Sequence, residues 1–293
     1  MLNFIQSKMK NFRGRLYKFN ILVMSNFESI DYILKNPKCS VARFGDGELD
    51  IINGKSIPYQ EYNPELAHNL KTILLRGSNS NLMVCLPDVF KKLNRYNSNC
   101  KNFYYEEFFY QNRKILRKIE SENNTYGSTF ISRPYIDLND KSNANNYFPK
   151  LKQLWDKKDI LIVEGKYSRS GEGNDLFANA KSVRRILCPA KNAFSCLSEI
   201  EQAIKKYSSN KLILLMLGPT AKLIVNDLYT QIPNQLIDLG HIDSEYEWFL
   251  MGANSKVKIP FKHTAEFNYD DNKVKLKKDN EFKKQVIIQI NCK

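Results

Sequence analysis

Two acidic residues separated by a single glycine form the pair in this chain that is best suited to chemistry. Asp46 and Glu48 follow a short apolar run that ends at Phe44, and Gly45 and Gly47 flank the first acid. Glycine permits positive φ and close backbone approach, so a tight turn here can present both carboxylates to one small space. Converging carboxylates repel each other unless a proton or a cation joins them, and Mg²⁺ or Mn²⁺ prefers such oxygen ligands. The spacing predicts a metal–diphosphate site after a strand, with a solvated Asp-Gly turn as the alternative.

A second polar segment follows the apolar run 160–163. Its glycines let backbone N–H groups turn toward a ligand, and its arginine can fork across phosphate oxygens. The spacing matches neither a P-loop nor a dinucleotide-binding fingerprint. The segment is therefore either an anion cradle or a flexible surface loop, and the candidate residues are Glu164, Gly165, Arg169, Gly171, Gly173, Asn174 and Asp175.

The run Leu-Gly-Pro-Thr-Ala-Lys at 217–222 marks a third position of interest. Proline is favoured in the first turn of a helix, where exposed N–H groups suit an anion. Gly218, Thr220 and Lys222 either assist a phosphate there or simply begin a helix.

One of the three histidines stands among acids at 241–247. Asp243 and Glu247 are four residues apart, so a helix places them on one face. His241 is suited to diphosphate binding, proton transfer or a metal position, or else to a structural hydrogen bond. If a general base is required, His241, Asp243 and Glu245 are the candidates.

The elements that must position these residues follow an alternating pattern. Continuous apolar runs predict strands at 39–44, 81–86, 128–132, 160–164, 183–188, 212–217 and 235–238. Helical patterns lie between them at 64–76, 105–121, 147–157, 194–207 and 220–230. Such alternation predicts an α/β fold with a Rossmann-like open, mostly parallel sheet flanked by helices. Ligands bind such sheets beyond the carboxyl ends of the strands, which is where all four polar segments fall.

Length and charge limit the function classes. The 293 residues predict a single domain at 25–268, with a basic extension at 1–24 and a lysine-rich, solvated appendage at 269–293. The net charge of +14 favours an anionic partner. Because the sequence contains no compact nucleic-acid-binding motif, we do not expect that partner to be a nucleic acid. Residues 1–20 are basic and amphipathic, which is consistent with peripheral membrane contact or with an ordinary docked helix.

The chain has no apolar run of about 18 residues and no secretory-signal pattern at its start, so we expect a cytoplasmic protein, with the inner membrane face as an option. The six cysteines form no C-x-x-C pair, which predicts neither a disulfide framework nor a zinc site.

Taken in order, the four motifs resemble those of the GT-D-type glycosyltransferases, a bacterial, metal-dependent family first described as a domain of unknown function. The resemblance runs from about residue 25 to about residue 265 and rests on R-F-G-D-G-E, V-E-G…S-R-S-G-E-G-N-D-L-F, L-G-P-T-A-K and D-L-G-H-I-D-S-E-Y-E-W. It implies a Rossmann-like fold distinct from the better-known glycosyltransferase architectures. It also implies a hexosyltransferase that moves a sugar from a nucleotide diphosphate donor, typically UDP-linked, to a glycan acceptor in surface glycoprotein or polysaccharide biosynthesis.

The same resemblance implies roles for individual residues. The metal motif of the family falls on Asp46 and Glu48, which would hold Mn²⁺ or Mg²⁺, and its H-x-D-x-E-Y-E-W pattern puts catalysis among His241, Asp243, Glu245 and Glu247. Donor binding falls on Arg43, Gly45, Gly47, the seven residues of the 164–175 segment, Gly218, Thr220 and Lys222.

Two other classes of function remain open on the residues alone. A metal-dependent phosphohydrolase or nucleotidyltransferase would also use converging acids and basic loops. A non-enzymatic module that binds an anionic polymer or a membrane would explain the charge, and it predicts steeply salt-dependent binding.

Overall fold

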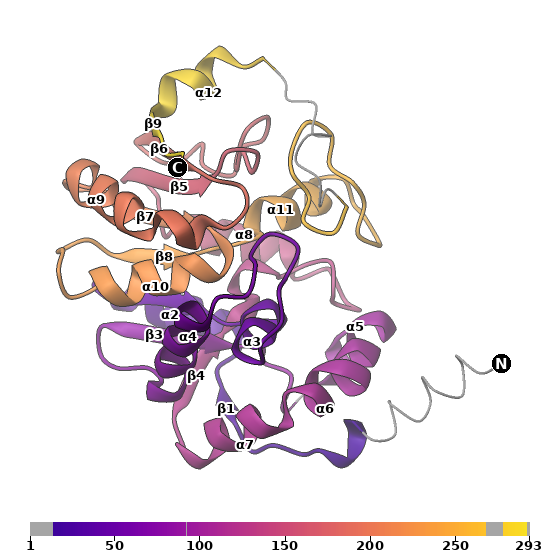
Figure 1. Cartoon of the computed structure of the whole chain (residues 1–293). Coiled ribbons are helices and arrows are strands. Elements are labelled where there is room, and N and C mark those ends of the chain that lie inside the picture. The colour runs from indigo at the N-terminus through magenta and orange to yellow at the C-terminus, as the bar shows by residue number, and fades with distance from the viewer. Residues whose placement is uncertain (1–13, 92, 268–277, 292–293) are drawn as a thin grey trace.

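A parallel β-sheet forms the centre of the molecule. The computed structural model describes residues 14–91, 93–267 and 278–291, and within them it has one nine-stranded sheet of order β1-β4-β3-β2-β8-β7-β5-β6-β9 (Figure 1). Every recorded strand pairing is parallel. The strands are β1 (Leu22–Val23), β2 (Ser40–Arg43), β3 (Leu82–Leu86), β4 (Thr125–Ser128), β5 (Asp159–Gly165), β6 (Ser182–Cys188), β7 (Leu212–Met216), β8 (Leu236–Asp238) and β9 (Val286–Gln289). The predicted α/β class with a mostly parallel open sheet is confirmed.

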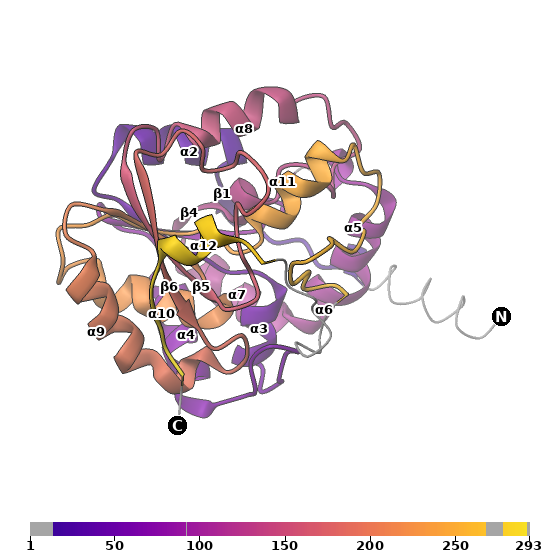
Figure 2. The ribbon, with the colours of Figure 1, turned by 90° about the horizontal axis from the view of Figure 1, so that it is seen from above.

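Helices cover both faces of this sheet. Seen from above, α2, α8 and α11 lie on one side and α4, α9 and α10 on the other (Figure 2). The helices are α2 (Asn26–Lys35), α3 (Asp46–Ile52), α4 (Pro64–Arg76), α5 (Ser98–Phe103), α6 (Phe109–Gln111), α7 (Arg113–Ser121), α8 (Ala144–Lys152), α9 (Leu197–Tyr207), α10 (Gly218–Leu228), α11 (Ile242–Leu250) and α12 (Asn280–Gln285).

The strands are apolar without alternation because each face of the sheet packs into its own core. In β5, Leu161 and Val163 belong to the cluster beneath α4, α9 and α10, while Ile160 and Ile162 belong to the cluster beneath α2, α8 and α11. Successive side chains of a strand point to opposite faces, so a strand covered on both sides must be apolar at every position. This double burial holds the strand ends, and the loops that follow them, in fixed positions.

Several predicted elements differ from those observed. The predicted strand at 128–132 is wrong, because β4 ends at Ser128 and a 3₁₀ turn (Thr129–Ser132) follows. The predicted helix at 105–121 is interrupted, since a π-helical turn (Tyr104–Phe108) leads into α6, and Asn112 separates α6 from α7. The glycines at 45 and 47 do not form an isolated tight turn. Gly45 is instead the N-cap of α3.

The end of the chain departs from the charge-based prediction. Residues 286–289 form β9, which pairs with β6, and Phe282 and Ile290 are buried. The expectation of a solvated appendage is therefore wrong for this part of the extension. Similarly, β1 at Leu22–Val23 belongs to the sheet although it falls in the predicted N-terminal extension.

Residues 1–13, on which most of the predicted membrane contact depends, lie outside the described residues. Within the described part, no helix has the length and apolarity that a membrane crossing needs. Cys39, Cys85, Cys100 and Cys188 are free and buried, whereas Cys196 is disulfide-bonded, which the cysteine spacing did not predict.

Candidate functional site

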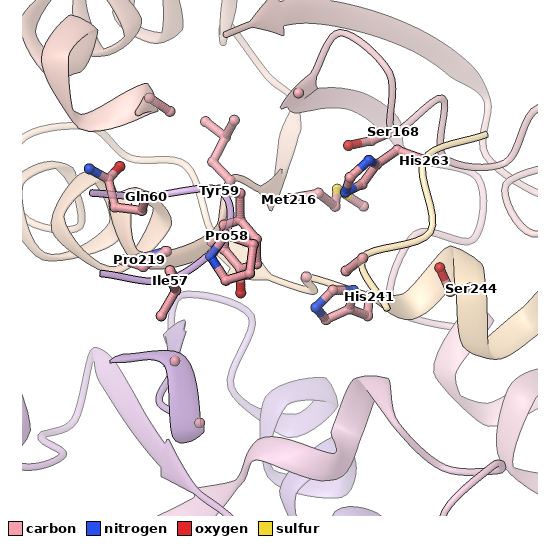
Figure 3. A pocket seen from close by; sticks show the side chains of 18 of the residues that line it. Ile57, Pro58, Tyr59, Gln60, Ser168, Met216, Pro219, His241, Ser244 and His263 are labelled. Carbon is pink, nitrogen blue, oxygen red and sulfur yellow. The ribbon is translucent and has the colours of Figure 1, made fainter. Parts of the chain in front are cut away.

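A cavity of about 400 Å³ opens at the carboxyl ends of the strands. Its lining comes from the segments that follow β2, β4, β5, β6, β7 and β8, together with the loop between α3 and α4 and the stretch 256–266 (Figure 3). The strand order changes direction between β2 and β8, and this is the position where open parallel sheets bind ligands. The volume lies in the range of small-molecule sites.

Asp46 is the acid that faces this cavity without a protein partner. It is the first residue of α3, and among the described residues no hydrogen bond or ion pair of 4 Å or less to another side chain is recorded for its carboxylate. Burial raises the pKa of Asp46, and the neighbouring Glu48 adds to this, while Arg133 opposes it. A carboxylate that lines a cavity without a cationic partner is stabilised by a bound cation.

Glu48 has both of its oxygens engaged. Its Oε2 accepts a hydrogen bond from the Gly45 N–H at 2.8 Å, and its Oε1 lies 2.8 Å from Lys222 Nζ. Glu48 thereby satisfies the backbone N–H of Gly45, the N-cap of α3, and pairs with a buried lysine. The two acids of the D-x-E pair are close together but differ in their bonding.

Lys222 extends this contact into a buried ionic chain. Its Nζ also lies 3.0 Å from Asp238 Oδ2 and donates to the Gly218 carbonyl at 2.9 Å. Arg43 donates from Nε to the Asp238 carbonyl at 2.8 Å, and its Nη2 lies 3.3 Å from Asp238 Oδ1. Burial raises the pKa of Asp238, but Arg43 and Lys222 outweigh it and hold that pKa below its usual range. Both cations line the cavity in orientations fixed by protein partners.

The histidine and acids after β8 separate into different environments. His241 and Asp243 line the cavity. Burial lowers the pKa of His241 to about 4 although Glu266 opposes the change, so the imidazole is neutral near pH 7. Glu245 is fully buried, and its Oε2 accepts from the Tyr135 and Ile136 N–H groups at 3.0 and 3.1 Å.

Asp243 and Glu247 share one face of α11, as their spacing predicts. Both contact Lys262, at 2.9 Å for Asp243 Oδ2 and 2.7 Å for Glu247 Oε1. Asn174 donates to both acids, and the Gly171 N–H donates to Asp243 at 2.7 Å. These two acids therefore hold the 164–175 segment and the stretch around Lys262 against α11.

A family model described as "Glycosyltransferase GT-D fold" matches residues 41–267 of this chain. The chain belongs to this family of glycosyltransferases. It is 50% identical over 270 residues to "Probable glycosyl transferase Gly" of Streptococcus gordonii and 47% identical over 263 residues to "Glycosyltransferase GlyD" of Streptococcus pneumoniae serotype 4. These alignments cover 92% and 90% of this chain but only 39% and 32% of the two relatives, so the chain spans well under half of their length.

Solved structures agree with this assignment. One, described as a new glycosyltransferase from Streptococcus sanguinis, is 49% identical with a TM-score of 0.89 and covers 93% of this chain and 100% of its own. Another, described as a domain of unknown function with a distinct glycosyltransferase fold, is 50% identical with a TM-score of 0.88 and covers 98% of this chain and 99% of its own. The family resemblance and its fold are thereby confirmed.

Within this GT-D domain, the 164–175 segment is mostly structural in its contacts. Arg169 pairs with Glu172, and its guanidinium lies 4.2 Å from the Phe282 ring centre. Glu164 pairs with Arg185. Asp175 accepts from Lys152 and Tyr246 rather than facing the cavity.

The predicted residues therefore divide into two groups. Those that line the cavity are Arg43, Gly45, Asp46, Gly47, Glu48, Gly165, Gly218, Lys222, His241 and Asp243. Those outside its lining are Glu164, Arg169, Gly171, Gly173, Asn174, Asp175, Thr220, Glu245 and Glu247.

The structure adds residues to the GT-D site that the sequence analysis missed. Arg133 lines the cavity, with Nη2 at 3.2 Å from Asp137 and 3.6 Å from Glu266, and its buried Nε makes no hydrogen bond within the described residues. Tyr59 and Glu266 also line it. Arg133 directly follows the strand predicted at 128–132, so its place after a strand was a signal that could have found it. Tyr59 and Glu266 lie in loops that no predicted strand end marks.

A divalent cation can be tested against these side chains. Asp46 fits, because Mg²⁺ and Mn²⁺ are commonly held by one or two carboxylates and completed by substrate phosphates. Glu48 fits as a second ligand only if its Oε1 exchanges Lys222 for the cation. Among the described residues, no group of three or more His, Cys, Asp or Glu side chains is placed to hold a metal without a co-ligand.

Proposed function

We propose that this GT-D glycosyltransferase moves a sugar from a nucleoside diphosphate donor, a UDP-sugar, to a glycan acceptor with the help of Mn²⁺ or Mg²⁺. The observation that carries the proposal is the unpaired Asp46 carboxylate in a cavity that also contains Lys222 and Arg133. A site with one free acid beside fixed cations suits a ligand that brings phosphates and a metal together.

Asp46 would hold the metal, which when bound neutralises the diphosphate as it departs. The chain itself supplies further stabilisation of that charge. Gly218, the first residue of α10, lines the cavity, and a helix start favours an anion. Arg133 lines the cavity as a further cation and is kept in place by Asp137, Glu245 and Glu266.

His241 is the best placed of the candidate bases. It lines the cavity and is neutral, so its imidazole can accept a proton from an acceptor hydroxyl. Glu245 is buried outside the lining and acts on the turn that carries Arg133. The Asp243 carboxylate forms an ion pair with Lys262 and accepts a hydrogen bond from the Gly171 N–H.

The first experiment is calorimetric titration of the chain with UDP, with and without Mn²⁺, followed by assay of sugar transfer with and without a glycan acceptor. Metal-dependent binding and acceptor-dependent transfer support the proposal. Phosphate release that no acceptor diverts into sugar transfer would instead indicate a phosphohydrolase. Binding of neither UDP nor another nucleoside diphosphate would contradict the proposal.

Two wider features belong to the same proposal. Because the chain spans well under half of the length of the named relatives, its acceptor and its place in surface glycan synthesis are part of the proposal. A cytoplasmic location, with membrane contact through residues 1–20, stays a prediction.

A further inference from the structure

A strap of residues 55–62, which joins α3 to α4, lies at the cavity. Its residues Ile57, Pro58, Tyr59 and Gln60 form part of the lining, and Figure 3 shows them across the cavity from His263. Ile57 and Gln60 exchange backbone hydrogen bonds of 2.9 and 3.1 Å, so the centre of the strap is a closed turn. The strap therefore has a defined shape although part of it is exposed.

Asn192 fastens this strap from the other half of the sheet. It follows β6, and its N–H donates to the Tyr59 carbonyl at 2.9 Å. Its side-chain Oδ1 accepts from the Glu61 N–H at 2.7 Å. Asn192 has φ of +53°, a left-handed conformation that asparagine and glycine tolerate better than most residues.

The position of Asn192 is itself fixed. The N–H and hydroxyl of Ser195 both donate to the Asn192 carbonyl, at 3.0 and 2.8 Å. The left-handed backbone and these two bonds direct the Asn192 N–H and Oδ1 toward the strap. Because the strap belongs to the β2 half of the sheet, the contact joins both halves above the cavity.

Tyr59 is the strap residue closest to the chemistry. A Cβ built on Gly218 would lie 2.7 Å from the Tyr59 ring, and one built on Gly47 would lie 3.5 Å from its hydroxyl oxygen. The ring thus lies beside the first residues of both α10 and α3. At neutral pH a tyrosine hydroxyl is protonated, so the Tyr59 hydroxyl can donate to an anionic oxygen.

We propose that Asn192 is a positioning residue that latches the strap over the cavity and thereby holds Tyr59 against the phosphates of the bound donor. This inference rests on the proposed function. The latch holds the strap in place before the donor arrives, so that less ordering entropy is lost on binding. Tyr59 makes the contact, and Asn192 acts through it.

The test compares Asn192→Gly with Asn192→Asp in the full chain. Both replacements tolerate the left-handed backbone, but only aspartate keeps an oxygen that can accept from the Glu61 N–H. Titration with UDP and Mn²⁺ should show about fivefold weaker binding for Asn192→Gly, the effect of losing one ordinary hydrogen bond, and nearly wild-type binding for Asn192→Asp. Thermal unfolding of each variant checks that the fold is intact.

A double-mutant cycle separates a latch from a general loss of structure. Tyr59→Ala should weaken UDP binding, and adding Asn192→Gly to it should have little further effect, because the latch then holds nothing that contacts the donor. Fully additive effects, equal weakening by both Asn192 variants, or unchanged binding by Asn192→Gly would overturn the inference. If one of these results is found while the wild-type protein binds UDP, only the inference about Asn192 is rejected and the proposed function is retained. If wild-type protein binds no nucleoside diphosphate, both proposals fail.

Discussion

At the scale of single residues, Asp46 and Glu48 differ in a way that their spacing does not reveal. Asp46 is free to bind a ligand, whereas Glu48 caps α3 and pairs with buried Lys222. A D-x-E pair can thus combine one acid used for binding with one acid used for structure. Separate substitutions at the two positions can distinguish these roles.

Asp46→Asn should weaken Mn²⁺-dependent UDP binding by tenfold or more while leaving the free energy of unfolding nearly unchanged. The amide removes the negative charge that a cation requires, and the side chain has no partner to lose within the described residues. Calorimetry and urea unfolding measure the two effects. Asp31→Asn, at a half-exposed residue that pairs with Lys150, is the matched control and should leave UDP binding as in the wild type.

Glu48→Gln should lower the free energy of unfolding by about 3 kcal/mol, because it leaves the buried Lys222 ammonium with one carboxylate fewer. Urea denaturation measures this loss. A variant as stable as the wild type, with UDP binding abolished, would show instead that Glu48 is chiefly a ligand.

His241 gives a prediction for pH. Its pKa in the folded protein, about 4, lies below the ordinary value near 6.5, so the unfolded chain binds the proton first as pH falls. The stability that depends on neutral His241 is complete above about pH 6.5 and is lost as pH falls toward 4. His241→Gln should flatten this part of the stability curve, measured by urea unfolding between pH 4 and 7. If the free energy of unfolding of His241→Gln depends on pH as in the wild type, other groups cause this pH dependence.

At the scale of elements, the last strand and the helix before it complete the fold on the β6 side. β9 pairs with β6, and the Phe282 ring of α12 lies beneath the guanidinium groups of Arg169 and Arg185, at 4.2 and 4.6 Å. The sequence analysis predicted that Arg169 binds the donor, but its guanidinium contacts Glu172 and the Phe282 ring of α12 instead. We expect its contribution to be mainly to stability.

Phe282→Ala should therefore destabilise the protein by about 3 kcal/mol while leaving UDP binding within about twofold of the wild type. The ring is buried, and neither it nor Arg169 lines the cavity. Thermal unfolding and calorimetry measure the two quantities, with the exposed Leu16→Ala as the control. A large loss of UDP binding would instead indicate that Arg169 takes part in donor binding.

At the scale of the whole molecule, the cavity lies where the two halves of the sheet meet. The ends of β2 and β8 meet although they are nearly 200 residues apart in the sequence, as the contacts between Arg43 and Asp238 illustrate. A ligand that binds in this cavity stabilises the folded state by mass action, because the unfolded chain does not contain the binding site.

Mn²⁺ alone should raise the thermal midpoint by less than about 1 °C, because only Asp46 is available to it. UDP together with Mn²⁺, at about one hundred times the dissociation constant, should raise it by several degrees, and EDTA should reverse this increase. Differential scanning calorimetry measures both shifts. A full increase with Mn²⁺ alone would indicate a metal site that the protein completes without phosphates.

The apolar runs determined most of the sheet, because a strand buried on both faces must be apolar throughout, and the helix predicted at 64–76 coincides with α4. The short edge strands β1 and β9 lie in the apolar runs 21–24 and 286–290, but they were missed because the segments that contain them were assigned to basic extensions. Pairing with β4 and β6 decides their structure. The break near Asn112 was missed because its buried hydrogen bonds are not visible in helical periodicity.

For the site, the sequence by itself determined that acids, glycines and a histidine follow the strands, since residue types after a strand end can be read directly. Only the tertiary structure decided which of them face the cavity. It paired Glu48 with Lys222, turned Arg169 and Glu245 to structural partners, and brought Arg133, Tyr59 and Asn192 to the site. The physical reason is that an ionic or hydrogen-bond partner is chosen by distance in space, and crossovers of a parallel sheet bring together residues far apart in the chain.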